Sequence, residues 1–300
     1  MSYFEEVQIA AEQVIAIMNA KGYRLSFGGE GEVKKKIYVP TDARSEFLAN
    51  RALGDWAEKS LAAALREAAP AWSVAHYGQS DDISAGDEGF RVFYLGQLEL
   101  VRKYGKRPDL LVFDSKEVIS EYEGFDISML DFEVLDSLAR KALTSIEVRS
   151  SKVEALKYMD ARRQDRLVGK SNSSTRDTPS FTLKIEDLVI VYRWMERYRL
   201  SQSYCQVFFD SVWAINVLDM LRWVVNNKFK VENPDKSQGK ATILIPITAG
   251  KEIGRFKKVP DQRVHPKVNR LGRHDSYIEP VFEPGNLVLD FNALKQVVLR

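Results

Sequence analysis

Four charged residues near two short apolar runs have side chains that could bind a metal ion and a phosphate. Asp109 opens the run "DLLVFD", and Glu147, Arg149 and Lys152 lie in or just after the run "TSIEV". If these runs are neighbouring strands, the two carboxylates can share a divalent cation. Magnesium usually takes one or two protein carboxylates, and water and substrate phosphate complete its octahedron. A positive side chain beside them can hold the attacking water and stabilise charge on the phosphate.

The alternation of side chains along the second run predicts which residues share a face. On a strand, alternate side chains point the same way, so Ile146 and Val148 point to a core while Glu147 and Arg149 point together the other way. A solvated strand end is the alternative to a metal site. The elements that carry Asp109 and Glu147 decide between the two interpretations.

The positive member of the group is open between two residues. Arg149 stays protonated in proteins, so it could orient water or stabilise a phosphate but could not act as a base. Lys152 could do either, provided that the chain turns after the strand and returns the side chain to the site. Ser150 or Ser151 is a credible N-cap for a helix over 152–163, which would make that turn.

The order of elements predicted along the chain is helix, strand, strand, strand, helix, strand. Apolar residues at helical spacing favour helices, and short β-branched or aromatic runs favour strands. The predicted helices cover residues 3–20, 45–69, 185–199 and 211–225, and the predicted strands cover 33–39, 90–96, 109–114, 143–148 and 203–210.

With the elements in place, the charged residues resemble a known nuclease motif. "RPD" at 107–109, followed by Glu147 within "IEVRSSK", resembles the PD-(D/E)XK motif, and the predicted element order matches the core of that superfamily. The segments "EVRSS", "LKIEDLVIVYRWM" and "QVFFD" are most similar to segments of type II restriction endonucleases. The resemblance covers roughly residues 45–210. The motif's lysine normally lies two residues after the acid, where this chain has Arg149.

The resemblance implies an α/β (α+β) fold with a restriction-endonuclease-like core, in which a central mixed β-sheet is flanked by helices. It implies Mg²⁺-dependent hydrolysis of double-stranded DNA, usually by a homodimer that cuts a short palindromic site, with a cognate DNA methyltransferase as functional partner. We expect an N-terminal extension at 1–44, the nuclease core at 45–210, and a C-terminal part with a basic arm at 211–300, all packed together.

Glu58 is a further candidate for the metal site. It lies in the helix before the first core strands, where related nucleases often supply an extra carboxylate. Glu58 also shares a helical face with Arg51 and Asp55, as a solvated face would. We take the solvated face as the better interpretation and keep Glu58 as a candidate ligand.

Two basic segments, residues 161–180 and 251–273, are candidates for contact with the DNA backbone. Each lysine or arginine that neutralises a phosphate releases counterions. A solvated loop is the alternative for each. The segment 251–273 has eight Lys/Arg against Glu252 and Asp261, and we expect it to form an arm between strands "ATILIPI" and "SYIEPVF". The candidate DNA-binding residues are Arg162, Arg163, Arg166, Lys170, Arg255, Lys257, Lys258, Arg263, Lys267, Arg270 and Arg273.

Composition excludes several other classes of protein. The single cysteine, Cys205, rules out an intrachain disulfide and a multi-cysteine zinc site, and it is expected to be buried. The three histidines are too scattered for a recognisable zinc pattern. No long uncharged apolar stretch and no secretory signal pattern occurs, so we expect a cytoplasmic protein without membrane contact.

Three other interpretations remain open. A repair or recombination nuclease would recognise DNA structure and not sequence. A non-catalytic DNA-binding protein could retain a nuclease-like fold, and an enzyme unrelated to nucleic acids could carry the motif by chance. Cleavage of a long DNA with magnesium, followed by sequencing of the ends, separates these possibilities.

Overall fold

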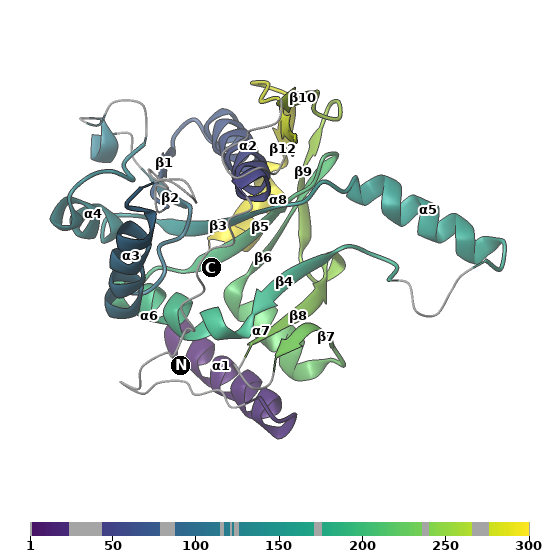
Figure 1. The fold of residues 1–300 in the computed structure, drawn as a ribbon, viewed down its shortest axis with the longest axis horizontal. Coiled ribbons are helices and arrows are strands. Elements are labelled where there is room, and N and C mark those ends of the chain that lie inside the picture. The colour runs from purple at the N-terminus through teal and green to yellow at the C-terminus, as the bar shows by residue number, and fades with distance from the viewer. Residues whose placement is uncertain are drawn as a thin grey trace.

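The computed structural model describes residues 2–23, 44–78, 88–114, 117–120, 122, 126–170, 176–235, 240–265 and 276–299 (Figure 1). The helices are α1 (Tyr3–Ala20), α2 (Arg44–Ala68), α3 (Phe90–Tyr104), α4 (Phe132–Ala139), α5 (Ala155–Leu167), α6 (Leu188–Tyr198), α7 (Val217–Asn226) and α8 (Phe291–Val298). The strands are β1 (Ser73–His76), β2 (Leu110–Phe113), β3 (Thr144–Ser150), β4 (Ser180–Lys184), β5 (Gln202–Val207), β6 (Ser211–Asn216), β7 (Lys230–Asp235), β8 (Lys240–Pro246), β9 (Lys251–Phe256), β10 (Gln262–His265), β11 (Tyr277–Pro280) and β12 (Leu287–Leu289).

A seven-stranded mixed sheet forms the centre of the protein, in the order β1-β2-β3-β5-β6-β9-β12. Its strands pair antiparallel except for β3 and β5, which are parallel. This arrangement confirms the predicted α/β fold with a central mixed sheet flanked by helices. Because β6, β9 and β12 continue the sheet beyond β5, the segment after residue 210 shares one sheet with the motif strands.

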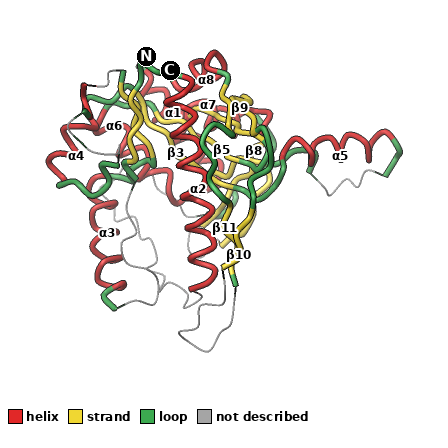
Figure 2. The backbone as a smooth tube through the Cα atoms, turned by 90° about the horizontal axis from the view of Figure 1, so that it is seen from above, coloured by secondary structure: helices red, strands yellow, loops and turns green. Residues whose placement is uncertain are grey.

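Helices cover both faces of this sheet and bury a separate apolar cluster on each. On one face, α2 and α8 pack over Ile146, Val148 and Cys205, and Cys205 is fully buried as predicted. On the other face, α1, α6 and α7 pack over side chains such as Tyr204 and Ile215 (Figures 1 and 2). Strands buried on both faces read as nearly continuous apolar runs in the sequence. The sheet therefore holds any polar side chain on its inner strands away from bulk water.

The predicted helices over 3–20, 45–69 and 185–199 are confirmed, as are the strands at 109–114, 143–148 and 203–210. The predicted strand at 33–39 lies outside the described residues. The strand predicted over 90–96 is wrong, because these residues begin helix α3. The missing strand is β1, so α2, β1, β2, β3, α6 and β5 follow the predicted order, with α3, α4, α5 and β4 inserted between them. A short apolar run fits both the helical period of 3.6 residues and the strand period of two. Only the continuation of the pattern to Tyr104 favours a helix.

The helix predicted over 211–225 is also wrong in its first half. Residues Ser211–Asn216 form β6, and α7 begins at Val217. Side chains of β6 are buried on both faces of the sheet, so the run lacks the period-2 pattern that would have marked a strand. The boundary is set by Asn216, whose side chain accepts a hydrogen bond from the Leu218 N–H at 3.0 Å. An asparagine at this position is a favoured N-cap.

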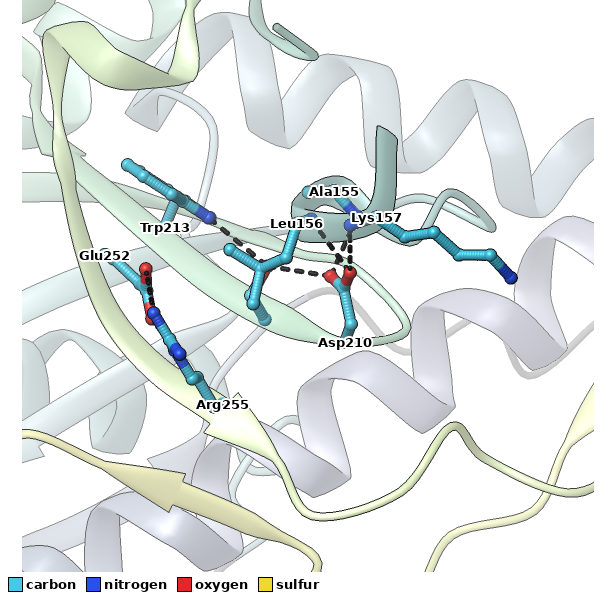
Figure 3. Close-up of polar contacts among 8 residues, drawn as sticks. Ala155, Leu156, Lys157, Asp210, Trp213, Glu252 and Arg255 are labelled. Carbon is cyan, nitrogen blue, oxygen red and sulfur yellow. Dashed lines mark hydrogen bonds and ion pairs between the residues drawn. The ribbon is translucent and has the colours of Figure 1, made fainter. Parts of the chain in front are cut away.

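Helix α5 projects from the body of the protein, and both views show it standing apart from the sheet (Figures 1 and 2). The predicted N-cap at Ser150 or Ser151 is wrong, because the helix begins at Ala155. Asp210, at the turn between β5 and β6, accepts hydrogen bonds from the N–H groups of Ala155, Leu156 and Lys157 at 2.8, 2.8 and 3.3 Å (Figure 3). A residue far along the chain therefore performs the capping.

The segment 251–273 does not form a free arm along its whole length, which corrects the prediction. Its first part, Lys251–Phe256, is strand β9 of the central sheet. Its next part, β10, pairs antiparallel with β11, and residues 266–275 lie outside the described part of the chain. A further sheet has the order β4-β8-β7.

Candidate active site

The two motif carboxylates meet where β2 and β3 pair. Asp109 immediately precedes β2, and the antiparallel register joins Leu110 to Ile146, so the next step brings Asp109 opposite Glu147. Asp109 Oδ2 accepts a hydrogen bond of 2.6 Å from the Val148 N–H. The sequence therefore predicted the neighbouring strands correctly, and one backbone hydrogen bond fixes the direction of the Asp109 carboxylate.

Glu147 is buried within the sheet, with only 1% of its surface exposed. Its Oε1 atom forms an ion pair with Lys106 Nζ and another with Arg149 Nη2, the latter at 2.9 Å. Its Oε2 atom is buried and has no hydrogen-bond partner among the described residues. A buried oxygen of this kind costs free energy unless a ligand or water satisfies it. The solvated strand end is thus the wrong interpretation for Glu147.

The electrostatics of Asp109 indicate crowded negative charge. Burial, followed by the carboxylates of Glu147 and Glu58, raises the pKa of Asp109 well above its ordinary value, although Lys106 and the Val148 N–H act in the opposite direction. Like charges that share a site disfavour ionisation, and a cation placed between them removes this effect. Gly78 lies against this carboxylate, since a Cβ added there would be 3.3 Å from Asp109 Oδ1.

Glu58 lies on the side of helix α2 that faces Asp109. Both residues line a cavity of about 380 Å³ together with His76 and Asp126. Glu58 Oε2 is 3.7 Å from His76 Nδ1, and the Glu58 side chain is 30% exposed. Its negative charge contributes to the raised pKa of Asp109. The helix face that carries Glu58 is therefore directed at the motif carboxylates, and Glu58 remains a candidate ligand.

The two candidates for the positive member differ in position. Arg149 shares the face of Glu147, as predicted, and its Nε atom is buried without a hydrogen-bond partner in the described part of the protein. Lys152 is exposed in the bend that follows β3. The structure therefore brings Arg149 to the acid and leaves Lys152 at the surface.

Several polar side chains near Glu147 were not identified from the sequence. Lys106 is the most direct of them, and Gln202 and Tyr204 lie on the neighbouring strand β5, where Tyr204 is in register with Glu147. Burial, followed by the Glu147 carboxylate, raises the pKa of Tyr204 to about 12. The buried amide of Gln202 makes no hydrogen bond to the other described residues. Parallel pairing of β3 with β5 brings Gln202 and Tyr204 beside β3, while Lys106 comes from the loop before β2, and no local sequence pattern indicates either contact.

A comparison with protein families identifies the family of this chain. A family model described as AccI restriction endonuclease matches residues 22–170 and 166–299. The chain belongs to the AccI restriction endonuclease family. It is therefore a DNA-hydrolysing enzyme, and DNA is its substrate. No curated protein and no solved structure matches the chain.

For an AccI-family enzyme, the basic residues of α5 are candidate contacts to DNA. The candidates lie on the exposed helix and just after it, and Arg163 is exposed. Arg162 is paired with Asp165, and Arg166 is paired with Asp177. Lys170 follows the helix and is exposed. Any phosphate contact by the two paired arginines must compete with an acidic neighbour.

The second basic segment also contains paired charges. Arg255 on β9 is paired with Glu252 (Figure 3), and Lys258 Nζ lies 3.3 Å from Asp261 and 2.8 Å from Glu283. Arg263 lies 3.9 Å from Glu279, and Lys257 is exposed. The remaining candidates, Lys267, Arg270 and Arg273, lie outside the described residues.

Two further observations concern metal binding and membrane contact. Across the described ranges, no group of three or more His, Cys, Asp or Glu side chains is arranged to hold a metal ion alone. Within the same ranges, no helix is both long and apolar enough to cross a membrane. A metal ion at Asp109 and Glu147 would thus take other ligands from water and DNA, which is the usual way magnesium binds.

Proposed function

We propose that the protein is a magnesium-dependent type II restriction endonuclease of the PD-(D/E)XK superfamily, which hydrolyses both strands of DNA at a specific sequence. The observation that carries this proposal is the state of the two motif carboxylates. Glu147 keeps a buried oxygen without a partner among the described residues, and burial followed by negative neighbours raises the pKa of Asp109. Both features fit a divalent cation with hard oxygen ligands.

Asp109 and Glu147 would hold the magnesium ion, with water and DNA oxygens as its other ligands, and Glu58 on the side of α2 would add negative charge near it. The bound ion would neutralise charge on the phosphate and lower the pKa of a bound water. Arg149 holds Glu147 through Oε1 at 2.9 Å and so orients the carboxylate. The burial of this group excludes bulk water, which strengthens each charge interaction in the site.

DNA binding would use the exposed cations of α5 and of the segment 251–273 for phosphate contacts. Arginines can also pair with guanine O6 and N7, so they are the better candidates for sequence reading. A palindromic target matches two-fold symmetry, and we therefore propose a homodimer. Protection of the host DNA would come from a cognate methyltransferase that modifies the same sequence.

Cleavage of a long DNA of known sequence tests the proposal. The purified protein is incubated with the DNA and magnesium, and the new ends are sequenced. We expect discrete fragments whose ends all carry the same short sequence. Ends at junctions, flaps or pre-existing termini would identify a structure-specific nuclease instead. DNA that is bound but not cut in magnesium would contradict the proposal in favour of a non-catalytic DNA-binding protein.

A further inference from the structure

The loop that leads into β2 places a lysine beside the buried acid of β3. Lys106 Nζ forms an ion pair with Glu147 Oε1, the oxygen that Arg149 Nη2 also contacts. Lys106 approaches from the loop between α3 and β2, while Arg149 approaches along β3 itself. Glu147 is therefore held between two cations that come from different elements of the fold.

The backbone around Lys106 is fixed by close packing against α6. Helix α3 ends at Tyr104 and is capped by Gly105, which has a φ of 91° in the left-handed region. A Cβ at Gly105 would lie 2.4 Å from the backbone nitrogen of Trp194, so no other residue fits there without a shift of the backbone. The next N–H, that of Lys106, donates to the Ile190 carbonyl at 3.0 Å. The Lys106 side chain thus starts from a rigid position.

Lys106 also borders open space next to the carboxylates. It lines a cavity of about 450 Å³ together with Asp109, Arg107 and Tyr104, and 28% of its side chain is exposed. A substrate group in this cavity would meet the lysine and the aspartate at once. Lys152, the other candidate lysine, is instead exposed in the bend after β3.

We propose that Lys106 is the active-site lysine of this enzyme, although it precedes the motif aspartate and does not follow the motif glutamate. Its ammonium would donate hydrogen bonds to an oxygen of the scissile phosphate, where negative charge develops during attack by water. Hydrolysis transfers the water hydroxyl to phosphorus and a proton to the departing sugar oxygen, and Lys106 stays protonated throughout. This role rests on the proposed function.

The ion pair with Glu147 gives Lys106 a second, measurable effect. The lysine at Oε1 and a divalent cation at the unpartnered Oε2 would share the Glu147 carboxylate and repel each other, so removal of the ammonium should strengthen metal binding. The same removal should weaken cleavage, because a charge-stabilising group is lost. A purely structural role would predict that both properties weaken together. The two measurements therefore move in opposite directions only if Lys106 acts on the substrate.

The experiment compares Lys106→Met with Lys103→Met, a control in the last turn of α3 that lies over the Tyr104 ring. Single-turnover cleavage is measured with Mg²⁺, and the rise in Tm is measured with Ca²⁺. We expect Lys106→Met to cleave about 10²-fold more slowly, the scale of losing one stabilising donor, with a larger rise in Tm. Lys103→Met should match the wild type in both. If Lys106→Met does not fold, Lys106→Gln keeps a donor toward Glu147 without the charge.

Chemical rescue provides a second test, which is possible because the protein's own cysteine is buried. Lys106→Cys creates a reactive thiol in the cavity, while Cys205 is fully buried and protected in the folded protein. Alkylation with 2-bromoethylamine restores an ammonium at nearly the length of lysine. We expect the modified variant to recover most of the lost cleavage, and alkylation of the wild type to change nothing.

The outcomes separate this proposal from the one it rests on. Wild-type cleavage with an unimpaired Lys106→Met variant would overturn the role of Lys106 and leave the magnesium nuclease intact. Equal losses of cleavage and of the Ca²⁺ response in Lys106→Met, without rescue by alkylation, would make the lysine structural only. A wild-type protein that cuts no DNA in magnesium would overturn the proposed function and this role together.

Discussion

The carboxylate centre and helix α5 both carry many charged residues, but the fold treats these charges differently. Glu147 is buried within β3 and Asp109 is half-buried beside it, and Glu147 Oε2 has no hydrogen-bond partner among the described residues. Helix α5 stands out from the body, and two of its arginines are paired with the half-buried Asp165 and the exposed Asp177. Charge in the centre therefore requires a ligand, whereas charge on α5 is already solvated or paired.

This contrast explains why a count of positive residues is a poor guide to the site. Exposed ion pairs contribute little free energy, about 0 to 1 kcal/mol, and they exchange easily with water. A buried carboxylate without a full set of partners costs more, so its environment must include whatever satisfies it. The centre is thus the region where substitutions should have the largest effects, and α5 the region where they should have smaller ones.

The largest effect is expected from removal of either motif carboxylate. Asp109→Ala and Glu147→Ala should each reduce magnesium-dependent cleavage by about 10³-fold or more, because metal stabilisation of the phosphate supplies several kcal/mol. DNA binding in calcium should remain, since the loss of negative charge relieves repulsion of phosphates. Single-turnover cleavage and a binding titration measure the two properties. Near wild-type cleavage by either variant would remove that residue from the mechanism.

The stability of the metal-free protein should also respond to the centre. In the unfolded chain the pKa of an aspartate is about 3.9, and in the folded protein burial and neighbouring carboxylates raise the pKa of Asp109. Between these two values the folded state binds more protons than the unfolded state, so stability falls as pH rises. We expect Asp109→Asn to unfold at a higher temperature than the wild type at pH 8, and the gap to close near pH 4.

Thermal unfolding in the presence of a chelator measures this difference, and magnesium should reduce it by stabilising the wild type alone. The matched control is Asp126→Asn, which replaces an exposed acid of the same cavity. That control should lack the stabilisation at pH 8 that is expected of Asp109→Asn. An Asp109→Asn variant that is no more stable than the wild type at pH 8 would contradict the electrostatic description of Asp109.

A smaller effect is expected at the root of α5. Asp210→Ala removes the acceptor for the first N–H groups of the helix, and loss of an N-cap typically costs about 1 kcal/mol. Hydrogen exchange of residues 155–157 should therefore become roughly fivefold faster. Ser211→Ala is the matched control, since the Ser211 hydroxyl donates to Asp210 Oδ1 at 2.9 Å and accepts from Trp213 Nε1 at 3.3 Å, and neither bond involves an N–H of α5. Faster exchange in β3 as well would show that α5 and the centre are not independent.

The smallest effect is expected from the paired cations of the segment 251–273. Substitution of Lys257 and Lys258 together would lower the salt slope of DNA binding by about two units if both lysines contacted phosphates. Because Lys258 already contacts Asp261 and Glu283, we expect the double alanine variant to lower the slope by about one unit. Binding across a salt series measures it. An unchanged slope would remove this segment from the DNA interface.

The sequence predicted the carboxylate pair because the relevant signals are local. The alternation in "SIEVR" assigns Glu147 and Arg149 to one face, and the apolar run after Asp109 marks a neighbouring strand. Burial on both sides could not be predicted in the same way, because it depends on helices from distant parts of the chain. The same reason explains the missed Lys106, whose direction is set by the packing of Gly105 against α6.

The wrong predictions share a physical cause with the missed residues. Residues 90–96 and 211–216 are short apolar runs, in which helix and strand periods fit almost equally well, and tertiary contacts decide between them. The cap of α5 comes from Asp210, 55 positions from Ala155, and not from the adjacent serines. Local rules therefore found the two neighbouring carboxylates of the strand pair, while contacts across the fold determined their surroundings.

Direct measurement of metal binding tests the central claim, that Asp109 and Glu147 form a divalent cation site. Manganese(II) accepts the same oxygen ligands as magnesium, and the electron paramagnetic resonance signal of the free ion falls as it binds. Titration of the wild type should remove free manganese in a saturable manner. The Asp109→Asn, Glu147→Gln double variant, verified as folded, should leave the signal unchanged. Equal binding of manganese by the wild type and the double variant would contradict the account.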